Sequence, residues 1–131
     1  MIRNIWSVLC RDIITDQESN TVSYIRCIEE GAAAKLPARI GPVLLGTLWE
    51  KTDKEPETVA FRVVLESPAK KQKVVLQSRP VVIDRTRQRL QFRINALQLT
   101  EFGIYTLLVE FNQEEKWKTA ARLPVLIRPV D

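Results

Sequence analysis

The sequence predicts an all-β fold: an antiparallel two-sheet sandwich, immunoglobulin-like or C2-like, with about eight strands. Apolar and polar residues alternate along most of the chain, and no stretch sustains the 3.6-residue period of a helix. Clusters of turn-forming residues separate the alternating runs at short intervals. The 131 residues are 45% apolar and 27% charged, which is typical of one globular domain, residues 1–131.

The expected strands follow in chain order from these runs. Turn-forming segments such as "DQESN", "TDKEPE", "SPAKK" and "NQEE" fall between them. One short segment, "CIEEGAAAKL", could instead hold a helix of one or two turns, because Gly31 and Pro37 bound it. The eight runs are Ile2–Asp16, Thr21–Glu30, Ile40–Lys51, Val59–Leu65, Lys73–Ile83, Arg89–Asn95, Tyr105–Phe111 and Trp117–Val125.

Alternation also predicts which side chains face the core. Within three of the runs, the residues expected on one apolar face are Val59, Phe61, Val63 and Leu65; Leu90, Phe92 and Ile94; and Tyr105, Leu107, Val109 and Phe111. In the last run the residues expected on one face are Trp117, Thr119, Ala121, Leu123 and Val125.

The first two runs form a hairpin whose register can be predicted. If "DQESNT" closes the hairpin with Asp16 opposite Thr21, then Cys10 lies opposite Cys27. Two interpretations of this pair remain open: a redox-sensitive cross-strand pair, or two small apolar side chains in a reducing compartment. Two cysteines form neither a disulfide framework nor a zinc site, which needs four ligands.

The segment "TEFGIYTLLVEF", Thr100 to Phe111, carries the pattern of a tyrosine corner. In immunoglobulin-like sandwiches an acidic residue, a glycine and a tyrosine stand at alternate positions, and the tyrosine hydroxyl bonds to backbone upstream. Here these are Glu101, Gly103 and Tyr105. Antibody domains have a cysteine two residues after the tyrosine, where this chain has Leu107. We therefore expect a structural corner without an inter-sheet disulfide.

The chain also resembles a family of small bacterial β-sandwich proteins classed as a domain of unknown function. The resemblance rests on "LCRDIITD", "VSYIRCIEE", "LPARIGPVLLGTLWE", "VAFRVVLES", "LQLTEFGIYTLLVEFN" and "LPVLIRP", in this order over almost the full length. It implies a β-sandwich and transfers no substrate or catalytic residue. The turn "SPAKKQK" and the arginine density after it depart from that family's pattern.

The sequence offers few side chains in patterns typical of catalysis, and we expect no enzyme, no metal and no cofactor. The chain has no histidine, which removes His-based acid–base catalysis and most zinc and iron sites. Ser67 and Lys70 have S-x-x-K spacing, but the Ser-Pro pair is a turn signal. No apolar run reaches the ~18 residues of a membrane span, and no secretory signal is evident, which predicts a cytoplasmic protein without membrane contact.

Positive charge is concentrated between Ser67 and Thr100. This segment has eight basic residues and one acid, Asp84, for +7 in a chain of net +4, so the remainder sums to −3. Arg85 precedes a strand on which four polar residues share one face, and the four are Arg87, Arg89, Gln91 and Arg93. Such a row suits carboxylate or phosphate recognition, or is a solvated face paired with Glu66 and Glu110.

Two tryptophans near strand ends admit two interpretations. Trp49 precedes Glu50 and Lys51, and Trp117 lies between Lys116 and Lys118. Each either caps the core or marks a protein interface, where Trp and Arg provide most binding hot spots.

These observations favour a non-enzymatic module for protein–protein interaction, as an adaptor or subunit of a bacterial assembly, using the arginine-rich face. The alternative is binding of a polyanion or nucleic acid through the same residues. Only Phe92 offers an aromatic ring among the basic residues, and it is expected to point inward. A homo-oligomer stays open, because Lys73–Ile83 could pair with its own copy unless Pro80 prevents it.

Overall fold

The computed structural model describes residues 1–131, and all of its regular structure is β-strand. The all-β prediction is confirmed. The strands are β1 (Ile2–Asp16), β2 (Thr21–Cys27), β3 (Glu30–Ala33), β4 (Ala38–Ile40), β5 (Val43–Lys51), β6 (Glu57–Glu66), β7 (Gln72–Gln77), β8 (Val81–Ile83), β9 (Arg87–Ile94), β10 (Leu97–Leu99), β11 (Gly103–Gln113) and β12 (Lys116–Pro129).

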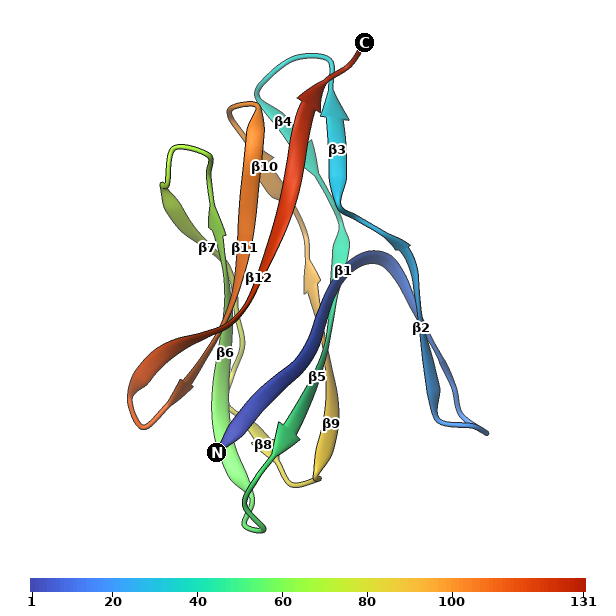
Figure 1. The fold of residues 1–131 in the computed structure, drawn as a ribbon, viewed down its shortest axis with the longest axis vertical. Coiled ribbons are helices and arrows are strands. Elements are labelled where there is room, and N and C mark those ends of the chain that lie inside the picture. The colour runs from blue at the N-terminus through green and yellow to red at the C-terminus, as the bar shows by residue number, and fades with distance from the viewer.

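These strands form three sheets. A four-stranded sheet has the order β2-β1-β5-β9, and a six-stranded sheet has the order β3-β12-β11-β6-β7, with β8 also pairing with β6. The third sheet contains only β10 and β4. Figure 1 shows the β1–β2 hairpin extending away from the body of the molecule. No helix in the structure has the length and apolar composition needed to cross a bilayer.

A single apolar core joins the two larger sheets. Trp49 of β5 packs on Phe61 of β6, with ring centroids 4.9 Å apart, and on Phe111 of β11 at 5.8 Å. Phe92 of β9 contacts Phe61 at 5.8 Å. The Trp49 indole donates a buried hydrogen bond to Thr47 Oγ1 (2.7 Å). Aromatic pairs at these distances hold the two sheets face to face in a sandwich-like arrangement.

Alternation correctly identified most of the core. Every residue of the two predicted faces on β6 and β11 is buried, and so are Phe92 and Ile94 of β9. The number of strands was wrong, because there are twelve rather than eight. Two predicted runs are each split by a proline, Pro42 between β4 and β5 and Pro80 between β7 and β8. Proline has no N–H to donate to a ladder, and at these two positions the strand is interrupted.

The predicted helix in "CIEEGAAAKL" is wrong. Residues Glu30–Ala33 form β3, which pairs in parallel with Leu126–Pro129 of β12. This pairing also departs from a purely antiparallel sandwich. Free backbone groups at the edge of β12 offer hydrogen bonds that a one-turn helix would lack, so tertiary pairing overrides the local preference.

The predicted hairpin register is confirmed. Asp16 pairs with Thr21 and Cys10 with Cys27. The Asp16 carboxylate accepts the backbone N–H of Glu18 (2.9 Å) inside the turn. Cys10 is buried, Cys27 is exposed and both thiols are free. The pKa of Cys10 is raised, first by burial and then by the neighbouring Cys27.

The tyrosine corner has the predicted bonding. The Tyr105 hydroxyl accepts the backbone N–H groups of Thr100 (3.0 Å) and Glu101 (3.1 Å). Gly103 has φ of 131°, a conformation that favours glycine. The Glu101 carboxylate accepts the backbone N–H of Ala69 (3.1 Å), which ties the corner to the turn between β6 and β7. All three motif residues therefore have structural roles.

The single face predicted for Trp117–Val125 is wrong. Val109 pairs with Ala121 while Glu110 pairs with Thr119, so Ala120 is an extra residue, a β-bulge in β12. The bulge reverses the alternation. Val125 faces the core, whereas Trp117 and Thr119 lie on the outer face with Glu110, whose carboxylate accepts the Thr119 hydroxyl (2.9 Å).

Candidate functional site

The polar face predicted on β9 is present. Arg87, Gln91 and Arg93 are exposed and Arg89 is half-buried, whereas Phe92 and Ile94 on the opposite face are buried. Arg85 is exposed in the connection that enters the strand. β9 forms one edge of its sheet, with β5 as its only neighbour. The strand period therefore places the predicted row of polar side chains on one outer surface.

A groove lies over the first half of this surface and has a volume of about 630 Å³. We call it the arginine groove. Three guanidinium groups line it beside an indole ring and a single carboxylate. Its lining residues are Trp6, Asn20, Leu48, Asp84, Arg85, Arg87, Gln88 and Arg89.

The β1–β2 hairpin forms one wall of the arginine groove. Arg89 reaches across to the hairpin, where Nη2 donates to the Asn20 carbonyl (2.6 Å) and Nη1 to its side-chain oxygen (3.2 Å). Trp6 is 39% exposed and its indole donates to the Tyr24 hydroxyl (2.9 Å). The Tyr24 ring in turn lies against Gly46, where any Cβ would collide with it.

The charges of the groove residues are partly compensated by one glutamate. Glu50 accepts from Arg3 (Nε 2.7 Å) and lies 3.5 Å from Arg87 Nε. The Arg3 hydrogen bond is the main reason that the pKa of Glu50 is lowered, and Arg87 adds to the effect. Arg85 has no carboxylate within ion-pair distance, and Arg89 bonds only to neutral groups. The groove therefore keeps an excess of positive charge.

The glutamates expected to neutralise the arginines have other partners. Glu110 pairs with Arg62 (2.7 Å) in the six-stranded sheet, and Glu66 at the end of β6 pairs with Lys70 (3.8 Å) in the following turn. They lie in the opposite layer from β9. Arg93, farther along β9, bonds to the side-chain oxygen of Asn95 (3.3 Å) instead of a carboxylate. The predicted pairing of the row with Glu66 and Glu110 is therefore wrong.

The two tryptophans have different environments. Trp49 has no exposed surface, so it belongs to the core and cannot contact a partner. Trp117 lies on the outer face of the six-stranded sheet, where the Arg62 guanidinium stacks 4.2 Å above its ring. Neither tryptophan lines the arginine groove. The tryptophan that does is Trp6, together with Asn20, Leu48 and Gln88.

Sequence reasoning missed the hairpin wall, although one signal for it exists. Gly46 interrupts the apolar run of β5, and an isolated glycine within a strand marks a close approach. The glycine therefore indicates that a side chain packs closely on β5 at this position. The sequence does not say which one, because the contact with Tyr24 depends on how the hairpin bends.

Ser67, which has the spacing of a catalytic serine, has a structural role in this fold. Ser67 lies in the tight β6–β7 turn, where its hydroxyl accepts the backbone N–H of Lys71 (3.1 Å). No group of three or more cysteine, aspartate or glutamate side chains gathers closely enough to hold a metal ion.

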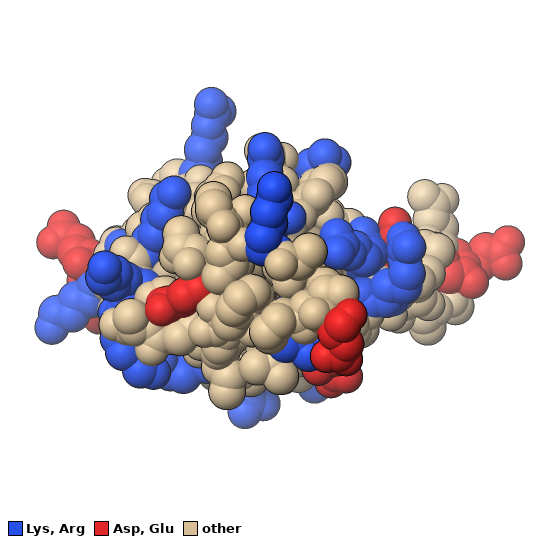
Figure 2. Space-filling view, turned by 90° about the horizontal axis from the view of Figure 1, so that it is seen from above, with Lys and Arg blue, Asp and Glu red and all other residues tan.

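Figure 2 shows basic side chains spread over much of the end of the molecule that lies uppermost in Figure 1, with acidic ones at few places.

Neither a comparison with models of known protein families nor a search among curated protein sequences gives a match for this chain.

Proposed function

We propose that this protein is a non-enzymatic interaction module that binds an acidic segment of a partner protein in the arginine groove. The observation that carries the proposal is the placement of three arginines around the exposed ring of Trp6. Arginine and tryptophan are the side chains most enriched at binding hot spots, because both combine a large contact area with directed hydrogen bonds.

The charge balance of the groove favours a carboxylate ligand. Asp84 is the only acid in the lining, against Arg85, Arg87 and Arg89. A guanidinium can bind a carboxylate through two parallel hydrogen bonds, which are roughly twice as strong as neutral ones. Arg85 and Arg89 have no acidic partner in the free protein, so a ligand carboxylate adds an ion pair to each without displacing one.

We also assign the fold to the immunoglobulin-like sandwiches, on the support of the tyrosine corner at Glu101, Gly103 and Tyr105. The strand sequences support a relationship to the small bacterial β-sandwich family that the chain resembles. Together these favour a cytoplasmic adaptor or assembly subunit in a bacterium.

Charge reversal with a matched control tests the proposal. One variant changes Arg85, Arg87 and Arg89 to Glu, and the control changes three exposed arginines outside the groove: Arg11, Arg39 and Arg122. Both lower the net charge equally. Proteins captured from native lysate by the wild type and the control, but lost with the groove variant, are the expected partners. Their acidic segments, made as peptides, should bind the wild type in fluorescence anisotropy.

Two outcomes contradict the proposal. If the groove variant retains the same partners as the control, the groove is not the docking surface. If the wild type instead binds duplex or single-stranded oligonucleotides more tightly than the acidic peptides, with affinity that falls steeply with salt, the protein is a polyanion binder.

A further inference from the structure

The backbone of β9 has an unpaired edge, in addition to its row of polar side chains. β5 pairs with it on one side, and no strand lies on the other. The Lys51 N–H donates to the Thr86 carbonyl (2.9 Å) across the same ladder. Since hydrogen-bonded pairs recur every second residue, even-numbered residues direct their backbone groups toward β5. Arg87, Arg89, Gln91 and Arg93 therefore direct their N–H and C=O groups toward the free edge.

This edge combines two recognition elements with the same two-residue period. Its free backbone groups and its outward arginines belong to the same residues. A strand added here places every second side chain beside an arginine on the outer face, at cross-strand distance. The intervening side chains of the added strand point toward the interior of the sandwich.

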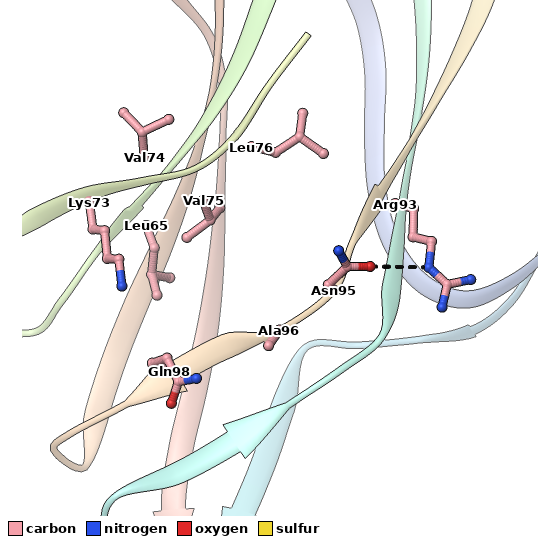
Figure 3. Close-up of a pocket in the computed structure, with 9 residues that line it drawn as sticks. All are labelled: Leu65, Lys73, Val74, Val75, Leu76, Arg93, Asn95, Ala96 and Gln98. Atoms are coloured by element: carbon pink, nitrogen blue, oxygen red, sulfur yellow. Dashed lines mark hydrogen bonds between the residues drawn. The ribbon is translucent and has the colours of Figure 1, made fainter.

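A cleft with five apolar residues among its nine lining residues opens beside the last part of this edge. It lies between β7 and the end of β9 with the following β10, and has a volume of about 450 Å³. Figure 3 shows Val75 and Lys73 pointing across this cleft and Val74 pointing away from it. Leu65 and Ala96 add apolar surface. No acidic residue lines the cleft. Its full lining is Leu65, Lys73, Val74, Val75, Leu76, Arg93, Asn95, Ala96 and Gln98.

We infer that the partner's segment binds as an added β-strand along β9, with acidic residues at alternate positions and apolar residues between them. This rests on the proposed function, and it specifies the conformation and sequence pattern of the ligand. The acidic side chains pair with Arg87, Arg89 and Arg93, and the apolar ones beside the end of β9 enter the cleft. Main-chain bonds supply affinity, and the arginine row and the cleft supply selectivity, as in other strand additions.

The opposite edge of the cleft, β7, is a poorer template. β7 carries a bulge opposite Val63 and Val64, has Lys73 in its first half and is followed by Pro80. Bulges, lysines and prolines are devices that block strand addition. β9 pairs with β5 over eight residues without a register shift and contains no proline.

Synthetic peptides separate strand addition from simple charge attraction. One peptide alternates glutamate and valine over the length of β9, and a scrambled peptide has the same composition. Two further versions of the alternating peptide are N-methylated, one on the glutamates and the other on the valines. An added strand offers only alternate N–H groups to β9, so we expect one methylated version to lose binding and the other to retain it.

Two variants of β9 test the same edge from the protein side. Gln91→Pro removes the outward N–H, and Gln91→Ala removes the same side chain while keeping that N–H. We expect binding of the alternating peptide to weaken about fivefold or more with proline, the worth of one net hydrogen bond, and less than about twofold with alanine. Amide hydrogen exchange on the wild type needs no variant: Arg87, Arg89, Gln91 and Arg93 should become protected when the peptide binds.

The outcomes distinguish this inference from the proposed function. Equal binding of alternating and scrambled peptides, with unchanged exchange at the β9 amides, overturns strand addition and leaves acidic-peptide binding intact. Equal loss with both methylated peptides also overturns it. If none of the peptides binds at low salt, the proposed acidic ligand is itself wrong.

Discussion

Removing the Tyr105 hydroxyl should destabilise the protein by about 2 kcal/mol. That oxygen accepts two backbone N–H groups, from Thr100 and Glu101, and the tyrosine is only 2% exposed. Each net hydrogen bond is worth about 1 kcal/mol, and Tyr105→Phe leaves both donors without this acceptor. The ring stays, so no large cavity contributes to the loss.

The chain offers a matched control, since Tyr24 is its only other tyrosine. The Tyr24 hydroxyl accepts one bond, from the partly exposed Trp6 indole, where water can replace it. Tyr24→Phe should therefore cost under about 1 kcal/mol. Urea unfolding followed by tryptophan fluorescence measures both, because Trp49 is buried against Phe61. If the Tyr105 variant loses no more stability than the Tyr24 variant at equal m-value, the tyrosine corner does not have the role assigned to it.

Three further measurements test other parts of the structure. Gly46→Ala should cost about 1–3 kcal/mol in urea unfolding, because the new Cβ meets the Tyr24 ring, and in the Tyr24→Ala background it should cost clearly less. The pKa of Glu50 is lowered by its arginine partners, so Glu50 contributes stability above the unfolded carboxyl pKa of about 4.3 and this contribution is lost as the pH falls through the folded pKa. Glu50→Gln should therefore lose less stability on acidification than the wild type. An identical dependence of stability on pH in the two proteins contradicts this. Limited alkylation read by mass spectrometry should label exposed Cys27 before buried Cys10, whose pKa is raised by burial, and the reverse order would show that the hairpin is packed differently.

Short-range patterns in the sequence predicted what depends on period and local turn chemistry. The Cys10–Cys27 register follows from a hairpin turn at Asp16, since two neighbouring strands and one short turn leave little freedom. The tyrosine corner is a local motif with its own hydrogen bonds, and the outward face of β9 follows from strict alternation. In each case the residues that decide the structure are close in sequence.

Features that depend on distant segments could not be predicted in this way. Glu50 as the partner of Arg87 requires the pairing of β5 with β9, which no local pattern specifies. The bulge at Ala120 inserts one residue into β12, so strict alternation assigned Trp117 to the wrong face of the strand. Of the two interpretations of Trp49, the core position was among those predicted, but its partners Phe61 and Phe111 come from the opposite sheet and were not. The groove was missed for the same reason, because one of its walls comes from the other end of the chain.

That wall has a thermodynamic consequence. The Arg89 guanidinium connects the sheet edge to the hairpin tip through two hydrogen bonds, one to the Asn20 carbonyl and one to its side-chain oxygen. A ligand that contacts both sides of the groove binds more tightly when the hairpin is bent over the sheet. By linkage, its binding must stabilise the bent hairpin by the same free energy. Ligand occupancy of the arginine groove and rigidity of the hairpin thus report on the same equilibrium. A substitution on the hairpin that changes its bend alters the affinity of the groove for a ligand without contacting that ligand.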